Sequence, residues 1–158
     1  MTDPSSVVWP AVDTAFRRSE VSSVVGRGDD VWIRASADLL HWRVKTRSGF
    51  AVVGPVPVSV GDRPLIRVRL LGISVVEPVE VVHVVMERDR VGFAYRTLPG
   101  HPVRGEEAFI VDRDDDGVVS ITVRSLTARS DVAGWRAVHP ILRVAQRIAR
   151  RRYLRALS

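Results

Sequence analysis

The sequence predicts an α+β fold in which an antiparallel sheet of about six to seven strands packs against a long C-terminal helix. Three observations support this class: a helical period over 30–47, β-branched segments separated by turn residues over 50–126, and an amphipathic segment over 140–156. At 158 residues the chain fits one domain, 1–158, with residues 1–18 as an N-terminal lid or extension.

The N-terminal part is expected to form one strand and one helix. Ser19–Gly26 alternates loosely between polar and apolar residues and predicts a strand. Apolar residues then recur at helical spacing, and Asp29 and Asp30 place negative charge in a first turn, where it is favourable. We therefore expect a continuous helix over 30–47 that ends at Gly49.

The middle of the chain is expected to supply about six antiparallel strands. Proline and glycine interrupt it too often for a helix, and β-branched runs lie between them. Asp116-Gly117 separates two such runs and predicts a hairpin, because this dipeptide adopts the positive φ of tight turns. One predicted strand places four residues on a single face: Val91, Phe93, Tyr95 and Thr97.

The predicted C-terminal helix, 140–156, carries most of the excess charge. The net charge is +6, yet residues 134–158 contain seven arginines and no acid, which leaves 17 basic and 18 acidic residues elsewhere. Val132–His139 is expected to form a separate short turn or helix, since Pro140 suits a first helical turn. An ordinary solvated face is the favoured interpretation of the arginines, and binding to nucleic acid or an acidic partner is the alternative.

Composition excludes several kinds of site. The sequence has no cysteine, so disulfides and thiolate metal sites are excluded. The four histidines lack metal-binding spacing, and residues 112–117 resemble a calcium loop only until its twelfth position, Val123. We predict no metal and no cofactor. A secretory signal and an apolar span of about 20 residues are not found, so a cytoplasmic protein without a transmembrane segment is expected.

Three segments resemble the signature blocks of uncharacterised protein family 0548, a domain of unknown function. They are GRGDDVWIRASADLLHW (26–42), GFAYRTLPGHPVRGEEAF (92–109) and RRYLRAL (151–157). The resemblance implies a START-like, helix-grip fold, in which a curved sheet wraps around the C-terminal helix and leaves an apolar cavity. Arg96 stands where the family usually has glycine, and SLTARS (125–130) also departs from its pattern.

The central segment holds the candidate site. Successive strand residues face opposite sides, so Glu107 is expected to face inward with Phe109 while Glu106 faces outward. An inward carboxylate needs a partner, for which Arg96 and Arg124 are the candidates. The predicted ligand-binding residues are Tyr95, Thr97, His101 and Glu107 at a polar end, Phe93, Trp42 and Leu142 in apolar walls, and Arg96 beside them.

The favoured function is binding of a hydrophobic or amphipathic small molecule between the sheet and the C-terminal helix. One alternative is a cofactor-free cyclase, hydratase or lyase that uses His101 or Glu107 as base and Tyr95 as acid. Another is nucleic-acid or acidic-partner binding through the Arg-rich helix, for which the sequence makes no strong case because no reading motif accompanies it.

Overall fold

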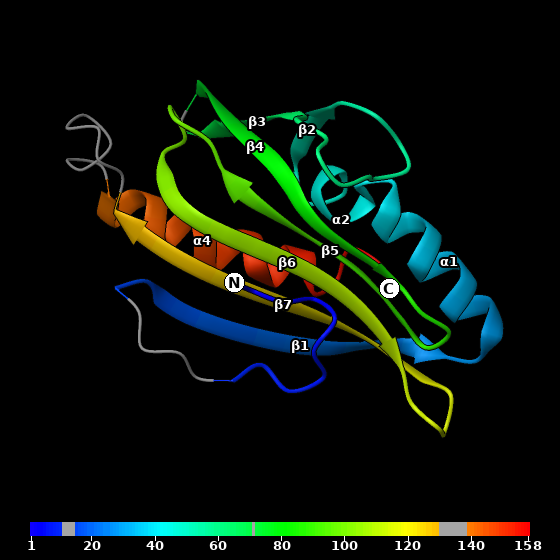
Figure 1. Ribbon diagram of the computed structural model, residues 1–158. Helices are drawn as coiled ribbons and strands as arrows, with labels where there is room; N and C mark the ends of the chain where they lie inside the picture. The colour runs from blue at the N-terminus through cyan, green and yellow to red at the C-terminus, as the bar shows by residue number, and fades with distance from the viewer. Residues whose placement is uncertain (11–14, 71, 130–138) are drawn as a thin grey trace.

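The computed structural model describes residues 1–10, 15–70, 72–129 and 139–158. Its centre is a seven-stranded antiparallel sheet with the order β1-β7-β6-β5-β4-β3-β2 (Figure 1). The strands are β1 (Arg17–Arg27), β2 (Phe50–Val53), β3 (Leu65–Leu70), β4 (Ile73–Met86), β5 (Arg90–Thr97), β6 (Val103–Arg113) and β7 (Val118–Arg129). The described helices are α1 (Asp29–Leu40), α2 (Arg43–Thr46) and α4 (His139–Tyr153).

The sheet curves around α4, and α1 and α2 lie towards one end of the same side (Figure 1). A continuous set of aromatic rings joins these layers. The ring of Trp42 meets Phe93 of β5 at 4.7 Å, and Phe93 meets Phe109 of β6 at 5.6 Å. Phe109 in turn meets Tyr153 of α4 edge-on at 5.1 Å. These contacts bury the inner face of the sheet and fix α4 against it.

The predicted strands are confirmed in number and order. Within the described residues six strands follow the first helix, and the Asp-Gly hairpin forms between β6 and β7, with the Gly117 N–H donating to Asp114 O at 3.0 Å. Val91, Phe93 and Tyr95 all lie in the core and share the inner face of β5. The α+β fold class is therefore confirmed.

The expected continuous helix over 30–47 is wrong. Helix α1 ends at Leu40, and α2 begins at Arg43 after Trp42 adopts a left-handed backbone with φ of 61°. This break turns the indole of Trp42 into the core, where the residue is 1% exposed. Burial of a large aromatic side chain is worth more than one further helical turn, so the tertiary contact overrides the local helical pattern.

The C-terminal helix has slightly different bounds from those expected. It runs from His139 to Tyr153, and residues 154–157 form turns rather than helix. The expected separate turn over Val132–His139 falls almost entirely on residues 130–138, outside the described residues.

The N-terminal segment crosses the outer face of the sheet, on the side opposite α4. Arg90 of β5 donates to the carbonyl oxygens of Pro4 at 2.6 Å and Ser6 at 2.8 Å. Arg124 of β7 donates to Asp3 O at 2.6 Å and also to Ser6 O at 2.9 Å. These outward-facing arginines therefore hold residues 3–6 against the sheet.

Gly105 allows β6 and β7 to approach closely, and its replacement tests this packing. A Cβ added at Gly105 would lie 1.9 Å from Leu126 O. We expect Gly105→Ala to lower the free energy of unfolding by about 3 kcal/mol, because backbone must move to relieve the collision. Urea denaturation measures this.

Gly61→Ala is the control. A Cβ at Gly61 has no atom within 4 Å, so this substitution costs only the strain of a non-glycine residue at a φ of 90°. That cost is about 1 kcal/mol. Equal losses in the two variants would contradict a tight contact at Gly105.

Candidate functional site

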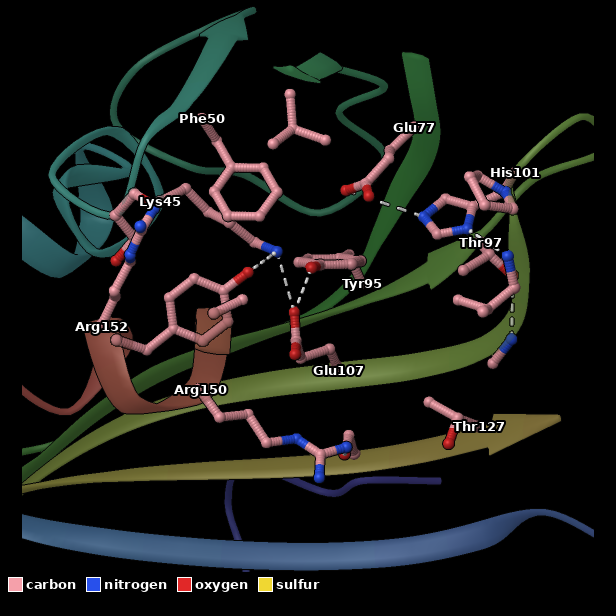
Figure 2. A pocket seen from close by; sticks show the side chains of 18 of the residues that line it. Lys45, Phe50, Glu77, Tyr95, Thr97, His101, Glu107, Thr127, Arg150 and Arg152 are labelled. Atoms are coloured by element: carbon pink, nitrogen blue, oxygen red, sulfur yellow. Dashed lines mark hydrogen bonds and ion pairs between the residues drawn. The ribbon is translucent and has the colours of Figure 1, made fainter. Parts of the chain in front are cut away.

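A pocket of about 290 Å³ lies between the inner face of the sheet, α4 and the end of α2. Tyr95 and Thr97 reach it from β5, Glu107 from β6, and Glu77 from β4. The β5–β6 turn contributes His101. Figure 2 shows these side chains directed towards a common space beneath the ring of Phe50. Its walls combine charged and hydroxyl groups with apolar ones, the latter including Phe50, Val68, Val103, Ile148 and Ala149.

A buried ion pair forms the centre of the polar wall. Lys45 Nζ lies 2.9 Å from Glu107 Oε2 and donates at 2.7 Å to the hydroxyl of Tyr153. The hydroxyl of Tyr95 also donates to Glu107 Oε2. Lys45 is 2% exposed, so α2, β5, β6 and α4 are connected by one network that is largely withdrawn from water.

Aromatic rings surround the ammonium group of Lys45. Nζ lies 4.7 Å from the ring centroids of Phe50 and Tyr153. It lies 5.2 Å from the centroid of Tyr95 and 5.4 Å from that of Phe109. Attraction between a cation and the faces of aromatic rings offsets part of the cost of burying the charge. The ion pair and the rings together make Lys45 a structural anchor of the pocket.

The network holds Glu107 in its charged form. Burial acts to raise the pKa of this carboxyl group, but the Lys45 ammonium and the hydrogen bonds from Tyr95 and Lys45 outweigh it, and the pKa lies below its usual value. Burial, followed by the nearby Glu107 carboxylate, raises the pKa of Tyr95 and Tyr153 well above the ordinary value. Both phenols therefore stay protonated at neutral pH.

His101 and Glu77 form a second polar group on another wall. The Val103 N–H donates to His101 Nδ1 at 3.1 Å, so in the neutral ring the proton resides on Nε2. Nε2 lies 4.0 Å from Glu77 Oε2. Burial, aided by the Lys45 charge, lowers the pKa of His101 to about 4, whereas burial raises that of Glu77. At neutral pH His101 is thus an uncharged ring beside the Glu77 carboxyl group.

The Arg-rich helix divides between the pocket and the surface. Arg150 donates to Ser19 Oγ at 3.0 Å and to Ser125 Oγ at 2.7 Å, and it lines the pocket. Arg152 also lines it and donates to Ser48 O at 3.3 Å. Arg147 and Arg151 are exposed. Two arginines of the helix are therefore part of the pocket, in addition to any role of the solvated face.

The structure brings together half of the residues expected at the ligand. Tyr95, Thr97, His101 and Glu107 all line the pocket. Thr97 also accepts the Gly105 N–H at 2.9 Å, which closes the β5–β6 hairpin. Whether these residues bind a ligand remains a prediction.

The other expected residues lie elsewhere or fall outside the description. Phe93 and Trp42 are fully buried in the core and are not among the residues that line the pocket. Arg96 is on the opposite face, where it pairs with Glu80 at 2.5 Å. The side chain of Leu142 lies outside the described residues.

Glu107 faces inward and Glu106 outward, as strand alternation predicts; the Glu106 carboxylate accepts the N–H of Thr2 at 2.5 Å. The expected arginine partner of Glu107 is wrong. Arg96 pairs with Glu80, and Arg124 pairs with Glu20 at 2.5 Å, because both side chains project from the outer face. Lys45 takes that role from α2, across the interior.

Among the pocket residues that escaped sequence reasoning are Lys45, Glu77 and Tyr153. Lys45 carried a signal, since it is the only lysine of a chain that otherwise uses arginine for every cation. Glu77 carried a weaker one, as the first acid in a run dominated by valine. Tyr153 lies within the third family-like segment but offers no local indication that it faces inward.

Two further properties concern the described residues only. Among them, no group of three or more histidine, cysteine or acidic side chains is arranged to hold a metal ion. None of the helices in this part of the chain combines the length and apolar character needed to cross a membrane.

A curved antiparallel sheet that grips a C-terminal helix defines the helix-grip, START-like class. Solved structures agree in fold. An aromatase/cyclase, Zhui, from Streptomyces sp. R1128 aligns with a TM-score of 0.63 at 13% identity over 90% of this chain and 91% of that protein. A hypothetical protein from Helicobacter pylori aligns with a TM-score of 0.60 at 16% identity over 99% and 96% of the two chains. At these identities the likeness concerns the fold alone.

Sequence comparison identifies the family. Residues 5–156 match the family described as "Domain of unknown function (DUF1990)", and the chain belongs to that family. A UPF0548 protein from Deinococcus radiodurans is 43% identical over 77 residues, which are 49% of this chain and 38% of that protein. The match therefore spans well under half of the relative's length. The resemblance noted in the sequence is confirmed.

Loss of the lysine tests the buried ion pair. We expect Lys45→Met to lower the free energy of unfolding by about 3 kcal/mol, because it leaves Glu107 buried without its counter-charge. Adding Glu107→Gln should restore at least half of this loss, since the amide is uncharged and still accepts the Tyr95 hydroxyl. Chemical denaturation of the single and double variants measures both effects.

Arg63→Met is the control, because it breaks an ion pair with Glu80 in which the arginine side chain is 67% exposed. It should change stability little. A Lys45→Met variant no less stable than Arg63→Met would contradict the anchoring role of Lys45.

The low pKa of His101 predicts a specific pH dependence. The folded protein holds this ring neutral down to a pKa of about 4, whereas the unfolded chain protonates it near 6.5. The unfolded state therefore binds more protons between these values, and stability should fall as pH decreases. The expected loss between pH 7 and pH 5 is about 2 kcal/mol.

His101→Asn provides the comparison, because it retains an acceptor for the Val103 N–H and has no imidazole to titrate. Urea denaturation at both pH values should show a smaller loss in this variant. The same loss in both proteins would exclude His101 as its source. Glu77, whose pKa is raised, contributes with the opposite sign in both.

Proposed function

We propose that this chain is a small-molecule-binding domain that holds an amphipathic ligand between its sheet and α4. The observation that carries the proposal is the composition of the pocket. Apolar groups such as Phe50, Val68 and Ile148 share its wall with a fixed polar network around Lys45 and with the Glu77–His101 pair. Ligand pockets typically combine an apolar lining with a few polar groups that orient the ligand.

The size and position of the pocket support a compact ligand. Its volume of about 290 Å³ is at the low end of small-molecule sites, which run from roughly 300 to 1,000 Å³. Among proteins of similar fold, norcoclaurine synthase of Thalictrum flavum was solved with a transition-state analogue, and it aligns with a TM-score of 0.50 at 12% identity over 89% of this chain and 97% of that one. That fold can accommodate a small organic molecule.

Binding is favoured over the chemistry first considered for Tyr95 and Glu107. The Tyr95 hydroxyl donates to Glu107, and Glu107 is already paired with Lys45. A general acid needs a proton that it can deliver to the substrate, and a base needs an accessible lone pair and a matched pKa. Here the pKa of Tyr95 is raised and that of Glu107 is lowered, so this pair suits a structural and orienting role.

Filling the pocket tests the proposal. Ala149 lines it from α4, and a phenyl group at this position would occupy ligand space. We expect Ala149→Phe to weaken the binding of naphthalene-sized aromatic probes at least ten-fold, about 1.4 kcal/mol, with an unchanged far-UV circular dichroism spectrum. Native mass spectrometry of protein purified from cells should also show a bound small molecule that this variant loses.

Ala51→Phe is the matched control, because Ala51 is exposed on β2 and does not line the pocket. It should bind as the wild type does. A wild-type protein that carries no small molecule and binds none of the probes saturably would contradict the proposed function.

A further inference from the structure

Arg150 brings a positive charge into the pocket without a directly paired carboxylate among the described residues. It lines the pocket from α4 and is half-buried. Its hydrogen bonds go to two neutral hydroxyl groups, those of Ser19 at 3.0 Å and Ser125 at 2.7 Å. The carboxylate of Glu107 is already paired with Lys45 at 2.9 Å. The guanidinium group of Arg150 is therefore held in place, but its charge is not neutralised by contact.

Partial burial makes this charge costly for the empty pocket. Burial lowers the pKa of Arg150, and the Glu107 carboxylate offsets only part of that effect. The guanidinium group nonetheless stays protonated at neutral pH, as arginine does throughout proteins. An anion that reaches it inside the pocket is attracted more strongly than at the surface, because less water screens the interaction.

The lining of the pocket also carries an excess of positive charge. Among the described residues it includes four cationic and three acidic side chains, which are Lys45, Arg69, Arg150 and Arg152 against Glu77, Glu106 and Glu107. One positive charge is left over when all three acids are ionised, and protonation of any acid increases the excess. The sign of the charge therefore does not depend on the ionisation state of Glu77.

The guanidinium group of Arg150 has the geometry to bind a carboxylate. An arginine carries five N–H donors, and the hydrogen bonds to Ser19 and Ser125 use two of them. Two N–H groups of one guanidinium plane can contact both oxygens of a carboxylate at once. Figure 2 shows the Arg150 side chain extended from α4 over the sheet, on the side where Glu107 and Thr127 lie.

Apolar groups lie next to Arg150 and suit the rest of such a ligand. Ile148 and Ala149 directly precede it in α4, and both line the pocket. Phe50 and Tyr95 add aromatic rings to the same space (Figure 2). A flat apolar body can pack on these groups while its charged end contacts Arg150.

We propose that Arg150 binds a carboxylate of the ligand, which is therefore an organic acid with a compact, preferably aromatic, body rather than an amine or a neutral molecule. This inference rests on the proposed function and deepens it. It assigns two cations of the pocket different tasks: Lys45 maintains the interior through Glu107, and Arg150 recognises the acid.

Three probes of similar shape test the assignment in the wild type. At pH 7, 2-naphthoate is negative, 2-naphthamide is neutral and 2-naphthylmethylamine is positive. Equilibrium dialysis with detection by naphthalene absorbance gives their dissociation constants. We expect 2-naphthoate to bind about ten-fold more tightly than the amide, the usual effect of charge-assisted hydrogen bonds in a partly buried site, and the amine to bind most weakly.

Two variants and one control locate the preference for the acid. Arg150→Gln should bring the acid and the amide to within about two-fold by weakening 2-naphthoate alone. Arg150→Lys keeps the charge but lacks the planar pair of donors, so it should reduce the preference about three-fold. Arg151→Gln is the control, because Arg151 is an exposed neighbour that does not line the pocket, and the net charge changes equally. It should leave the preference intact.

The outcomes separate this inference from the proposed function. Equal wild-type affinity for acid and amide, tightest binding of the amine, or a preference for the acid that survives in Arg150→Gln overturns the acid site but leaves a small-molecule pocket. Binding of none of the probes removes both proposals. Far-UV circular dichroism checks that the variants fold. If Arg150→Gln does not fold, Arg150→Lys decides, since an unchanged preference there overturns the contact and a reduced one supports it.

Discussion

The ion pair between Lys45 and Glu107 is the interaction on which the rest of the interior depends. It joins α2 to the centre of the sheet, and the Tyr153 hydroxyl extends the connection to α4. Neither charge could remain in this position alone, because burial without a partner costs several kcal/mol. The surrounding rings exclude water while still attracting the ammonium group. The helices are thereby kept at a spacing that leaves room for a pocket beyond the pair.

Sequence reasoning recovered what is determined locally. The inward orientation of Glu107 follows from strand alternation with Phe109, and the Asp116-Gly117 hairpin follows from turn chemistry. The partner of Glu107 could not be found in this way. Alternation along a strand does not say which helix covers it, and Lys45 reaches Glu107 from 62 residues away. Its isolation as the only lysine was visible, but composition alone did not connect it with the sheet.

Two other differences between the sequence predictions and the structure also arise from tertiary packing. A helical period continues through residues 41–42, and only the packing of Trp42 on Phe93 explains why the backbone turns left-handed there. Phe93 and Tyr95 share a strand face, yet Phe93 is in the solid core and Tyr95 borders the pocket. Periodicity assigns a residue to a face, but it does not say how far along that face α4 and the core extend. The position at which the pocket ends along β5 is therefore determined by tertiary packing.

The same ion pair bears on the proposed binding function, because it fixes part of the polar wall independently of any ligand. Because Glu107 is satisfied by Lys45 and Tyr95, a ligand has nothing to gain from displacing these groups. Glu77 and His101 are held by the sheet and the turn instead, and His101 Nε2 lies 4.0 Å from Glu77 Oε2. Preorganised donors and acceptors of this kind favour the ligand whose groups match them, since little ordering is required on binding. Under the proposed binding function, fixed polar groups would add selection by hydrogen bonding, which a cavity with only apolar walls lacks.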